Sequence, residues 1–274
     1  MNVGLIGCGA IGSTLARAIL EGKAGDAKLT AICDLYASRV NRLKEALSLP
    51  HLFCTTKPED LIHLSDVDFV IEAASQEAVH AVSEKALHAG KDLLIMSVGA
   101  LRDDGLTRRL ETLAREMGVK VYLPSGAICG LDGVKAASVE EITRVEITTT
   151  KHPRGLEGAP YLVQNRISLR NLTEPKTVYM GNAREAAKGF PKNVNVAVAL
   201  SLAGIGVDRT MVTIIADPDA TRTRHEVTVV GAFGELHTTV NNYVHPANPK
   251  TSYLGALAAV STLRKINKPI QIGT

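Results

Sequence analysis

The sequence lacks the features of a membrane-bound, secreted or nucleic-acid-binding protein. No apolar run approaches the ~18 residues that cross a bilayer. The N-terminal segment has no basic region followed by a long apolar one, which a secretory signal would need. The net charge is only +3, and the basic residues form no dense cluster. We therefore expect a cytoplasmic protein that binds neither nucleic acid nor membranes.

Cysteine is scarce and shows no metal-binding pattern. The four cysteines, Cys8, Cys33, Cys54 and Cys129, have no CxxC spacing. Reduced structural thiols are expected, and no metal site is predicted. The chain also has no internal repeat and no low-complexity segment. Its 45% hydrophobic and 22% charged residues are typical of a globular protein.

The first half of the chain alternates short apolar runs with helical patterns. The runs predicted as strands are Asn2–Ile6, Leu29–Cys33, Asp68–Ala73, Asp92–Val98 and Val119–Leu123. The predicted helices are one that begins near Ile11 and then Ala37–Leu47, Gln76–Ala89 and Leu106–Met117. Strands that alternate with such helices indicate right-handed crossovers and a doubly wound parallel sheet.

Three glycines follow the first predicted strand at the spacing of a dinucleotide-binding loop. Gly7, Gly9 and Gly12 form a GxGxxG motif between a strand and a helix. Gly7 permits the tight turn, Gly9 lets a pyrophosphate approach the backbone, and Gly12 lets the helix pack closely. Free N–H groups at the helix start stabilise phosphate charge. The motif predicts a Rossmann domain that binds NAD or NADP through this turn, including Ala10 and Ile11.

Asp34 ends the second predicted strand, 22 residues after Gly12, and is the expected ribose ligand. Its carboxylate would accept hydrogen bonds from the adenine ribose, which favours NAD over the 2′-phosphorylated cofactor. Arg39 and Arg42 on the next helix are within reach of a 2′-phosphate, although such residues are more often a solvated helix face. The sequence therefore leaves the choice between NAD and NADP open. Ala74 and Ser75 close the third strand, and the carboxyl ends of such strands line the cofactor crevice.

The pattern changes after Pro124 to strands with few helices. Predicted strands are Val145–Thr150, Thr210–Ile215, His225–Val230 and Glu235–Val240, the last two forming a hairpin. Helices are predicted at Val194–Ala203 and Thr251–Leu263. We predict an α/β fold, with a dinucleotide-binding Rossmann domain over 1–124 and a second α+β domain on a mostly antiparallel sheet over 125–250. That second domain would serve substrate binding and dimerisation, and 251–274 would pack back on the first domain.

Several segments of the second half resemble one known family. They are SGAICGLD from Ser125, KHP from Lys151, FPKNVNVAVALSLAG from Phe190, RHEVTVVGAFG from Arg224 and NPKTSYL from Asn248. With GCGAIG, EAAS and SVGAL of the first half, they resemble the L-aspartate dehydrogenase family. The resemblance extends in order over nearly the whole chain.

The resemblance implies a two-domain enzyme, usually a homodimer, that oxidises L-aspartate, a dicarboxylic amino acid, with NAD or NADP. The product, iminoaspartate, hydrolyses to oxaloacetate and ammonia or serves as the quinolinate precursor in NAD biosynthesis. By motif, Ala127 and Asn195 match the family's NAD-contacting residues, and His225 matches its catalytic histidine. Cys129 departs from the family, whose members often have glycine there.

His225 also fits a catalytic role by its chemistry. Oxidation of an amine leaves an iminium, so a group must accept a proton and steer water. An imidazole of ordinary pKa, near ~6.5, suits this task at neutral pH. The residue begins a strand and shares a face with Val227 and Val229, from which it is expected to reach an interdomain cleft. From the residues alone a half-buried structural histidine fits equally well, and the resemblance favours catalysis.

A dicarboxylate substrate needs cations and oriented donors. Lys192 precedes a helix expected near Asn193, and Lys250, Thr251 and Ser252 stand at the expected start of the final helix, where serine and threonine are also ordinary caps. Two other functions remain open. One is a related Rossmann reductase of the homoserine dehydrogenase or dihydrodipicolinate reductase type, and the other is a non-catalytic NAD-sensing protein.

Overall fold

The computed structural model describes residues 1–266 and 268–273, except for the side chains of Pro249 and Lys250. The chain divides into two compact units. The first comprises Met1–Pro124 and Ala256–Gln271, and the second comprises Ser125–Gly255 and Ile272–Thr274. Each unit has its own large sheet.

The first unit is built on a parallel sheet. Its described strands are β1 (Asn2–Ile6), β2 (Lys28–Cys33), β3 (Phe53–Thr55), β4 (Phe69–Glu72), β5 (Asp92–Ile95) and β6 (Val121–Tyr122). They pair in the order β3-β2-β1-β4-β5-β6, every pair parallel. The order reverses between β1 and β4, and ligands of doubly wound sheets bind outside the strand ends at that point. The predicted doubly wound sheet is confirmed.

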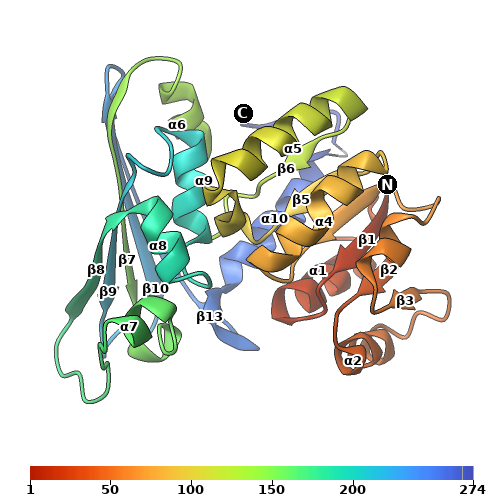
Figure 1. Ribbon diagram of the computed structural model, residues 1–274, viewed down its shortest axis with the longest axis horizontal. Helices are drawn as coiled ribbons and strands as arrows, with labels where there is room; N and C mark the ends of the chain where they lie inside the picture. The colour runs from red at the N-terminus through yellow and green to blue at the C-terminus, as the bar shows by residue number, and fades with distance from the viewer. Residues whose placement is uncertain (267, 274) are drawn as a thin grey trace. The chain divides into compact units, whose positions relative to one another are not determined.

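Helices cover both faces of this sheet (Figure 1). Their bounds are α1 (Ala10–Leu20), α2 (Ala37–Leu47), α3 (Pro58–Ile62), α4 (Gln76–His88), α5 (Asp104–Met117) and α10 (Tyr253–Ile266). Gly4 of β1 abuts Leu61 of α3, whereas Leu5 abuts Gly12 of α1. Since successive strand residues point to opposite faces, α1 and α3 lie on opposite sides. Leu263 of α10 joins the buried core on the α1 side.

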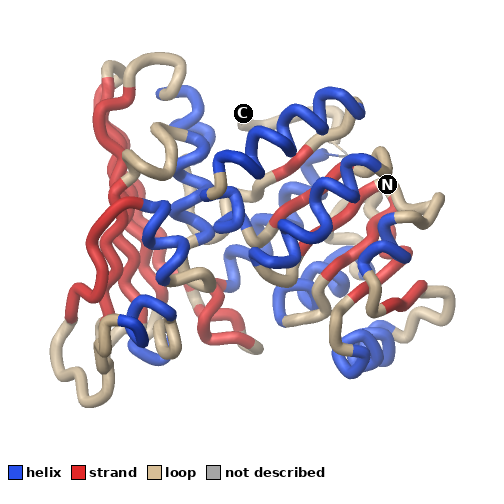
Figure 2. The backbone as a smooth tube through the Cα atoms, viewed as in Figure 1, coloured by secondary structure: helices blue, strands red, loops and turns tan. Residues whose placement is uncertain are grey.

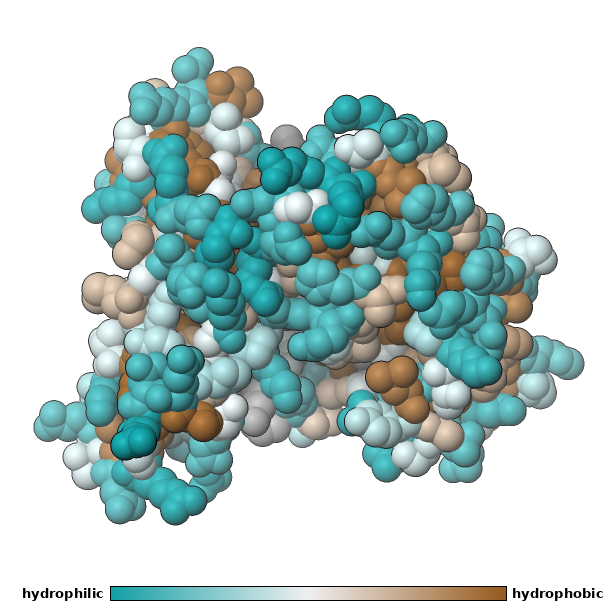
Figure 3. All heavy atoms as spheres, viewed as in Figure 1, coloured by the Kyte–Doolittle hydropathy of each residue, from teal (hydrophilic) through white to brown (hydrophobic). Residues whose placement is uncertain are grey.

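The surface over α4 and α5 is predominantly hydrophilic (Figure 3). Helix α5 shows the cause, because Leu106, Leu110 and Leu113 form one buried stripe, while Arg108 and Glu111 are exposed. Within the described ranges no helix is long and apolar enough to span a bilayer.

The second unit is built on a mixed sheet. Its described strands are β7 (Ile142–Lys151), β8 (Lys176–Asn182), β9 (Met211–Ala216), β10 (Thr223–Gly231) and β11 (Gly234–Asn242). They pair in the order β11-β10-β7-β9-β8, with β7 and β9 parallel and the other pairs antiparallel. The prediction of a mostly antiparallel sheet is confirmed.

Helices lie along one side of the mixed sheet, and Figure 2 shows them in blue beside the red strands. These are α6 (Leu131–Ala137), α7 (Pro160–Gln164), α8 (Ala183–Gly189) and α9 (Asn195–Ala203). Val145 on the sheet packs near Gly204, at the end of α9, which also meets Val134 of α6. The face of the sheet that carries Val145 is therefore the buried one.

Several predicted boundaries are wrong. The final helix begins at Tyr253 rather than Thr251, because β13 (Asn248–Ser252) pairs with β12 (Val244–His245) in a short hairpin. The predicted strand from Asp92 ends at Ile95, and a 3-10 helix, η1 (Val98–Arg102), follows. The elements β3, α3, α6, α7, β8 and α8 were not predicted, since short segments carry little periodicity.

Candidate functional site

The turn between β1 and α1 explains each glycine of the motif. Gly7 has a φ of +106°, and an added Cβ would lie 2.5 Å from the carbonyl oxygen of Ala73. An added Cβ at Gly12 would overlap the carbonyl oxygen of Gly7. At Gly9 an added Cβ would meet nothing within 4 Å. Packing of the chain on itself therefore requires Gly7 and Gly12, whereas Gly9 leaves room for a molecule to approach the backbone.

The start of α1 suits an anionic group. The helix begins at Ala10 with Gly9 as its N-cap, and Gly9 makes no side-chain cap. The first N–H groups of a helix, here including those of Ala10 and Ile11, have no intrahelical acceptor. They carry the positive end of the helix dipole, which stabilises phosphate. The residues at this turn therefore fit the pyrophosphate of NAD or NADP.

Asp34 connects the glycine turn to the end of β2. Its carboxylate accepts the backbone N–H of Cys8 at 2.9 Å and that of Tyr36 at 3.0 Å, one on each oxygen. A carboxylate oxygen has two acceptor positions, so each retains one for a ribose hydroxyl. Asp34 is 7% exposed, and Arg39 lies 3.7 Å from it while its guanidinium stacks over the Tyr36 ring. A cation thus stands beside the expected ribose position.

Glu72, at the end of β4, holds the predicted crevice residues Ala74 and Ser75, a role that the sequence analysis missed. It is completely buried. One carboxylate oxygen accepts the N–H groups of Ala74 and Ser75, at 2.8 and 3.0 Å, and the hydroxyl of Ser97 at 2.9 Å. The other accepts the N–H of Ser97 at 3.0 Å. Burial raises the pKa of Glu72, and these hydrogen bonds oppose the rise.

These four bonds join the segments that follow β4 and β5. Ala74 and Ser75, the predicted crevice residues, are exposed, and the Ser75 hydroxyl caps α4 by accepting the N–H of Ala78 at 3.2 Å. The available signal in the sequence was an acidic residue inside the apolar run DFVIEA, because carboxylates are almost never fully buried without partners.

His225 lies in a buried polar cluster of the second unit. It is 2% exposed on β10 and pairs with Thr149 on β7, whose hydroxyl lies 2.9 Å from its Nδ1. Lys151 is two residues beyond Thr149 on β7 and therefore on the same face. It is 4% exposed, and its Nζ donates a hydrogen bond to Oδ1 of Asn193 at 3.0 Å. We call Thr149, Lys151, Asn193 and His225 the β7–β10 cluster.

The pKa values in the β7–β10 cluster are strongly shifted. Burial, and then the charge of Lys151, lower the pKa of His225 to about 3. Burial lowers the pKa of Lys151 to about 8. The sequence argument assigned His225 an ordinary pKa, and this point is wrong because the side chain is removed from water. His225 is neutral at physiological pH.

The loop that carries Gly126 and Ala127 contacts both the end of β11 and the start of α9. The carbonyl oxygen of Ala127 accepts a hydrogen bond from the buried side chain of Asn242 at 3.0 Å. An added Cβ at Gly126 would lie 3.2 Å from Val196, the second residue of α9. Ala127 and Asn195, the residues matched to the family's cofactor contacts, therefore lie on adjoining segments.

The expected substrate residues are only partly where the sequence placed them. Lys192 is exposed in the loop before α9, which begins at Asn195 rather than near Asn193. Thr251 and Ser252 belong to β13, not to the final helix, and the side chain of Lys250 lies outside the described residues. The Thr251 hydroxyl is 3.3 Å from the Asn248 amide, and Ser252 is buried.

The strand β13 nevertheless packs beside η2 (Pro153–Gly155). That 3-10 helix begins two residues after Lys151, so the hairpin stands next to the segment that carries the cluster lysine. Thr251 and Ser252 are thus the last two residues of β13, and Ser252 directly precedes α10.

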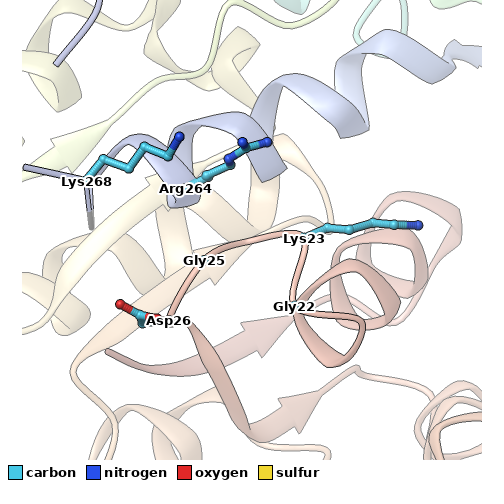
Figure 4. Close-up of a pocket in the computed structure, with 6 residues that line it drawn as sticks. All are labelled: Gly22, Lys23, Gly25, Asp26, Arg264 and Lys268. Atoms are coloured by element: carbon cyan, nitrogen blue, oxygen red, sulfur yellow. The ribbon is translucent and has the colours of Figure 1, made fainter. Parts of the chain in front are cut away.

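A surface pocket of the first unit lies away from the glycine turn. It is lined by Gly22, Lys23, Gly25, Asp26, Arg264 and Lys268 (Figure 4). Gly22 follows the C-terminal end of α1, so the pocket stands about 16 Å from the helix start that suits a pyrophosphate. It is a separate feature from the cofactor residues. Among the described residues, no group of three or more histidine, cysteine or acidic side chains could hold a metal ion.

Comparison with known proteins gives matches over the full chain. A family model described as the C-terminal region of aspartate dehydrogenase matches residues 132–266, and one described as the NAD-binding domain of homoserine dehydrogenase matches residues 7–124. L-aspartate dehydrogenases of Methanococcoides burtonii and Methanosarcina barkeri are each 48% identical, covering 100% of both chains. That of Nitrosopumilus maritimus is 41% identical over 100% of this chain and 99% of its own.

Solved structures show the same relationship. The crystal structure of aspartate dehydrogenase from Thermotoga maritima has a TM-score of 0.77 and 27% identity, covering 100% of this chain and 99% of that one. A homoserine dehydrogenase from Thiobacillus denitrificans has a TM-score of 0.60 at 14% identity, covering 96% of this chain and 73% of that one, a likeness of fold alone.

Proposed function

Because the chain belongs to the L-aspartate dehydrogenase family, we propose that it oxidises L-aspartate to iminoaspartate and that the β7–β10 cluster carries the chemistry. The chain is an NAD(P)-dependent oxidoreductase. The observation that supports the proposal most directly is the fixed, buried imidazole of His225, bonded to Thr149 beside a buried lysine. Packing alone does not require that arrangement, because buried polar groups are costly.

The first unit holds the cofactor in this proposal. The residues that would contact it there are Gly7, Gly9, Ala10, Ile11, Gly12, Asp34, Ala74 and Ser75, and the family match adds Ala127 and Asn195. NAD or NADP supplies the hydride acceptor when bound. The open approach to the backbone at Gly9 and the uncapped start of α1 support this role.

His225 positions the amine and then the water. Thr149 holds Nδ1, which leaves Nε2 for the substrate side and fixes the ring orientation. A neutral imidazole hydrogen-bonds the amino nitrogen without repelling it. After oxidation the same nitrogen orients a water molecule toward the imine carbon, and hydrolysis gives oxaloacetate and ammonia.

Two alternative functions can be distinguished from L-aspartate oxidation by an assay of substrate turnover. A reductase of the homoserine dehydrogenase or dihydrodipicolinate reductase type would share the first unit, and a non-catalytic NAD sensor would need no buried His225. The match of residues 132–266 to the aspartate dehydrogenase C-terminal region favours L-aspartate over the other substrates.

The decisive experiment is a spectrophotometric screen of amino acids, with homoserine included, against NAD and NADP. We expect L-aspartate to give the highest kcat/KM. Turnover of homoserine but not of L-aspartate would overturn the proposal, and cofactor binding without any turnover would indicate a sensor.

We further propose that the enzyme is a cytoplasmic homodimer whose imine product feeds quinolinate formation and hence NAD biosynthesis. The family resemblance supports each point. Analytical ultracentrifugation of the purified protein tests the dimer, with a monomeric sedimentation coefficient at micromolar concentration as the contrary result. Complementation of a strain unable to make iminoaspartate tests the pathway.

A further inference from the structure

We propose that Lys151 accepts the proton that the α-ammonium group of the substrate must lose before oxidation. This inference rests on the proposed function and assigns its first step to a residue other than His225. The lysine ends β7 on the same face as Thr149 and His225, and it is buried. Lysine is rarely buried, and buried lysines often serve as bases.

The hydrogen bond to Asn193 fixes the amine of Lys151 in a suitable form. A neutral lysine amine has two N–H donors and one lone pair. One N–H donates to Oδ1 of Asn193 at 3.0 Å. The amide oxygen accepts equally well from an ammonium group, so this bond survives when the lysine gains a proton. Asn193 therefore orients the head group in both states without neutralising it as a carboxylate would.

The proton balance of the step is simple. Aspartate arrives with an α-ammonium group, whose nitrogen has no lone pair to form a C=N bond. One N–H bond breaks, its electron pair stays on the substrate nitrogen, and the proton forms a bond with Nζ of Lys151. No oxidant is consumed. Loss of the hydride then leaves an iminium, and its hydrolysis by one water gives the keto acid and an ammonium ion. The lysine passes its proton to solvent and so regains its lone pair.

The ionisable surroundings favour Lys151 over His225 as the acceptor. Burial gives Lys151 a pKa of about 8, near neutrality, whereas that of His225 is about 3, so protonation of the imidazole is strongly uphill. The ionisable residues on the adjoining segments include Arg224, His225 and Glu226 on β10, Asp217 after β9, Lys192 before α9, and His152 and Arg154 next in the chain. The charge of Lys151 lowers the pKa of His225, so a protonated lysine keeps the imidazole neutral.

The test combines Lys151→Ala with added primary amines. We expect kcat for L-aspartate to fall by about 10²–10⁴-fold while KM changes little. Ethylamine and its less basic fluorinated analogues should restore part of the rate, in proportion to their basicity. The wild-type rise of kcat/KM with pH near 8 should disappear in the variant. Lys176→Ala, which removes an exposed lysine from β8 of the same sheet, is the matched control and should retain both rate and pH profile.

Lys151→Arg and Lys151→Met separate the other roles. A residue that only binds a substrate carboxylate would give a raised KM with kcat retained, and arginine would replace it. A purely structural residue would give a lower melting temperature and no amine rescue, and methionine, of similar length, would restore activity. Either pattern overturns the inference, and NAD binding measured by fluorescence shows whether each variant is folded. If the wild-type protein does not oxidise L-aspartate at all, the proposed function fails independently of Lys151.

Discussion

The carboxylate of Asp34 accepts the backbone N–H of Cys8 at 2.9 Å, so the end of β2 fixes the middle of the glycine turn. One side chain thus shapes the expected pyrophosphate site and stands at the expected ribose site. We therefore expect binding of the two halves of the cofactor to be coupled through that bond, and a change at Asp34 to affect both stability and cofactor choice.

We predict that Asp34→Ala raises the KM for NAD more than that for NADP, because only NAD presents a free 2′-hydroxyl. The melting temperature should also fall, since the N–H groups of Cys8 and Tyr36 lose their acceptor. Arg39→Gln is the complementary variant and should weaken NADP more than NAD. Steady-state kinetics with both cofactors check this. An equal rise of the KM for NAD and for NADP in Asp34→Ala would show that Asp34 does not bind the ribose.

Gly9→Ala and Gly12→Ala should differ in kind. A methyl group at Gly9 meets no protein atom, so the fold should be retained while the dissociation constant for NAD rises at least tenfold. A methyl group at Gly12 collides with Gly7, so that variant should have a lower melting temperature even without cofactor. Melting curves with and without NAD distinguish the two, and unchanged affinity in Gly9→Ala would contradict the cofactor site.

His225→Ala should lower turnover of L-aspartate by about 10²–10⁴-fold, because the variant loses the imidazole that orients first the amine and then the water. Cofactor affinity should barely change. Turnover and melting temperature are measured on the same preparation. A variant that is less stable but fully active would show that His225 is a packing residue.

The buried neutral histidine should make the protein sensitive to acid. The pKa of His225 is near 6.5 when unfolded and about 3 when folded, so the unfolded chain binds more protons between these values. Stability is therefore retained above pH 6.5 and lost as the pH falls toward 3, by up to about 1.4 kcal/mol per pH unit. Urea unfolding of His225→Gln between pH 6 and 4 should show a shallower dependence, whereas His237→Gln, at an exposed site, should match wild type.

Glu72→Gln should be destabilised by about 1–3 kcal/mol, because the amide nitrogen replaces one acceptor and, where the amide oxygen keeps the other three bonds, faces the N–H of Ser97. NAD affinity should fall as well, since the segments after β4 and β5 are then less tightly joined. Glu77→Gln, an exposed acid on the next helix, is the control for lost charge. Wild-type stability in Glu72→Gln would mean that the four hydrogen bonds are not needed.

The parallel sheet was predictable because its strands are continuous apolar runs, and the glycine turn because its spacing reflects backbone packing. The shared face of Val227, Val229 and His225 follows from alternation, and the structure has this face buried. The polar partners of His225 were not predictable in this way. Thr149 is 76 residues away, and only the strand register brings the two side chains together.

Lys151 shows the limit of residue type as a guide. A lysine suggests an exposed cation, so the sequence favours Lys192 and Lys250 as partners of the substrate carboxylates, and Lys151 stands out only as part of the KHP motif. It lies beside β10 and the loop before α9, neither of which is local in sequence. The shift of the His225 pKa has the same origin, because desolvation is a property of the packed unit.

Glu72 has a consequence for the kinetics of cofactor binding. Its hydrogen bonds order the segments after β4 and β5 within the protein alone, so little conformational entropy is lost when a ligand arrives there. Association should then proceed as docking onto a rigid surface, with a single kinetic phase whose rate rises linearly with cofactor concentration and no slow isomerisation afterwards.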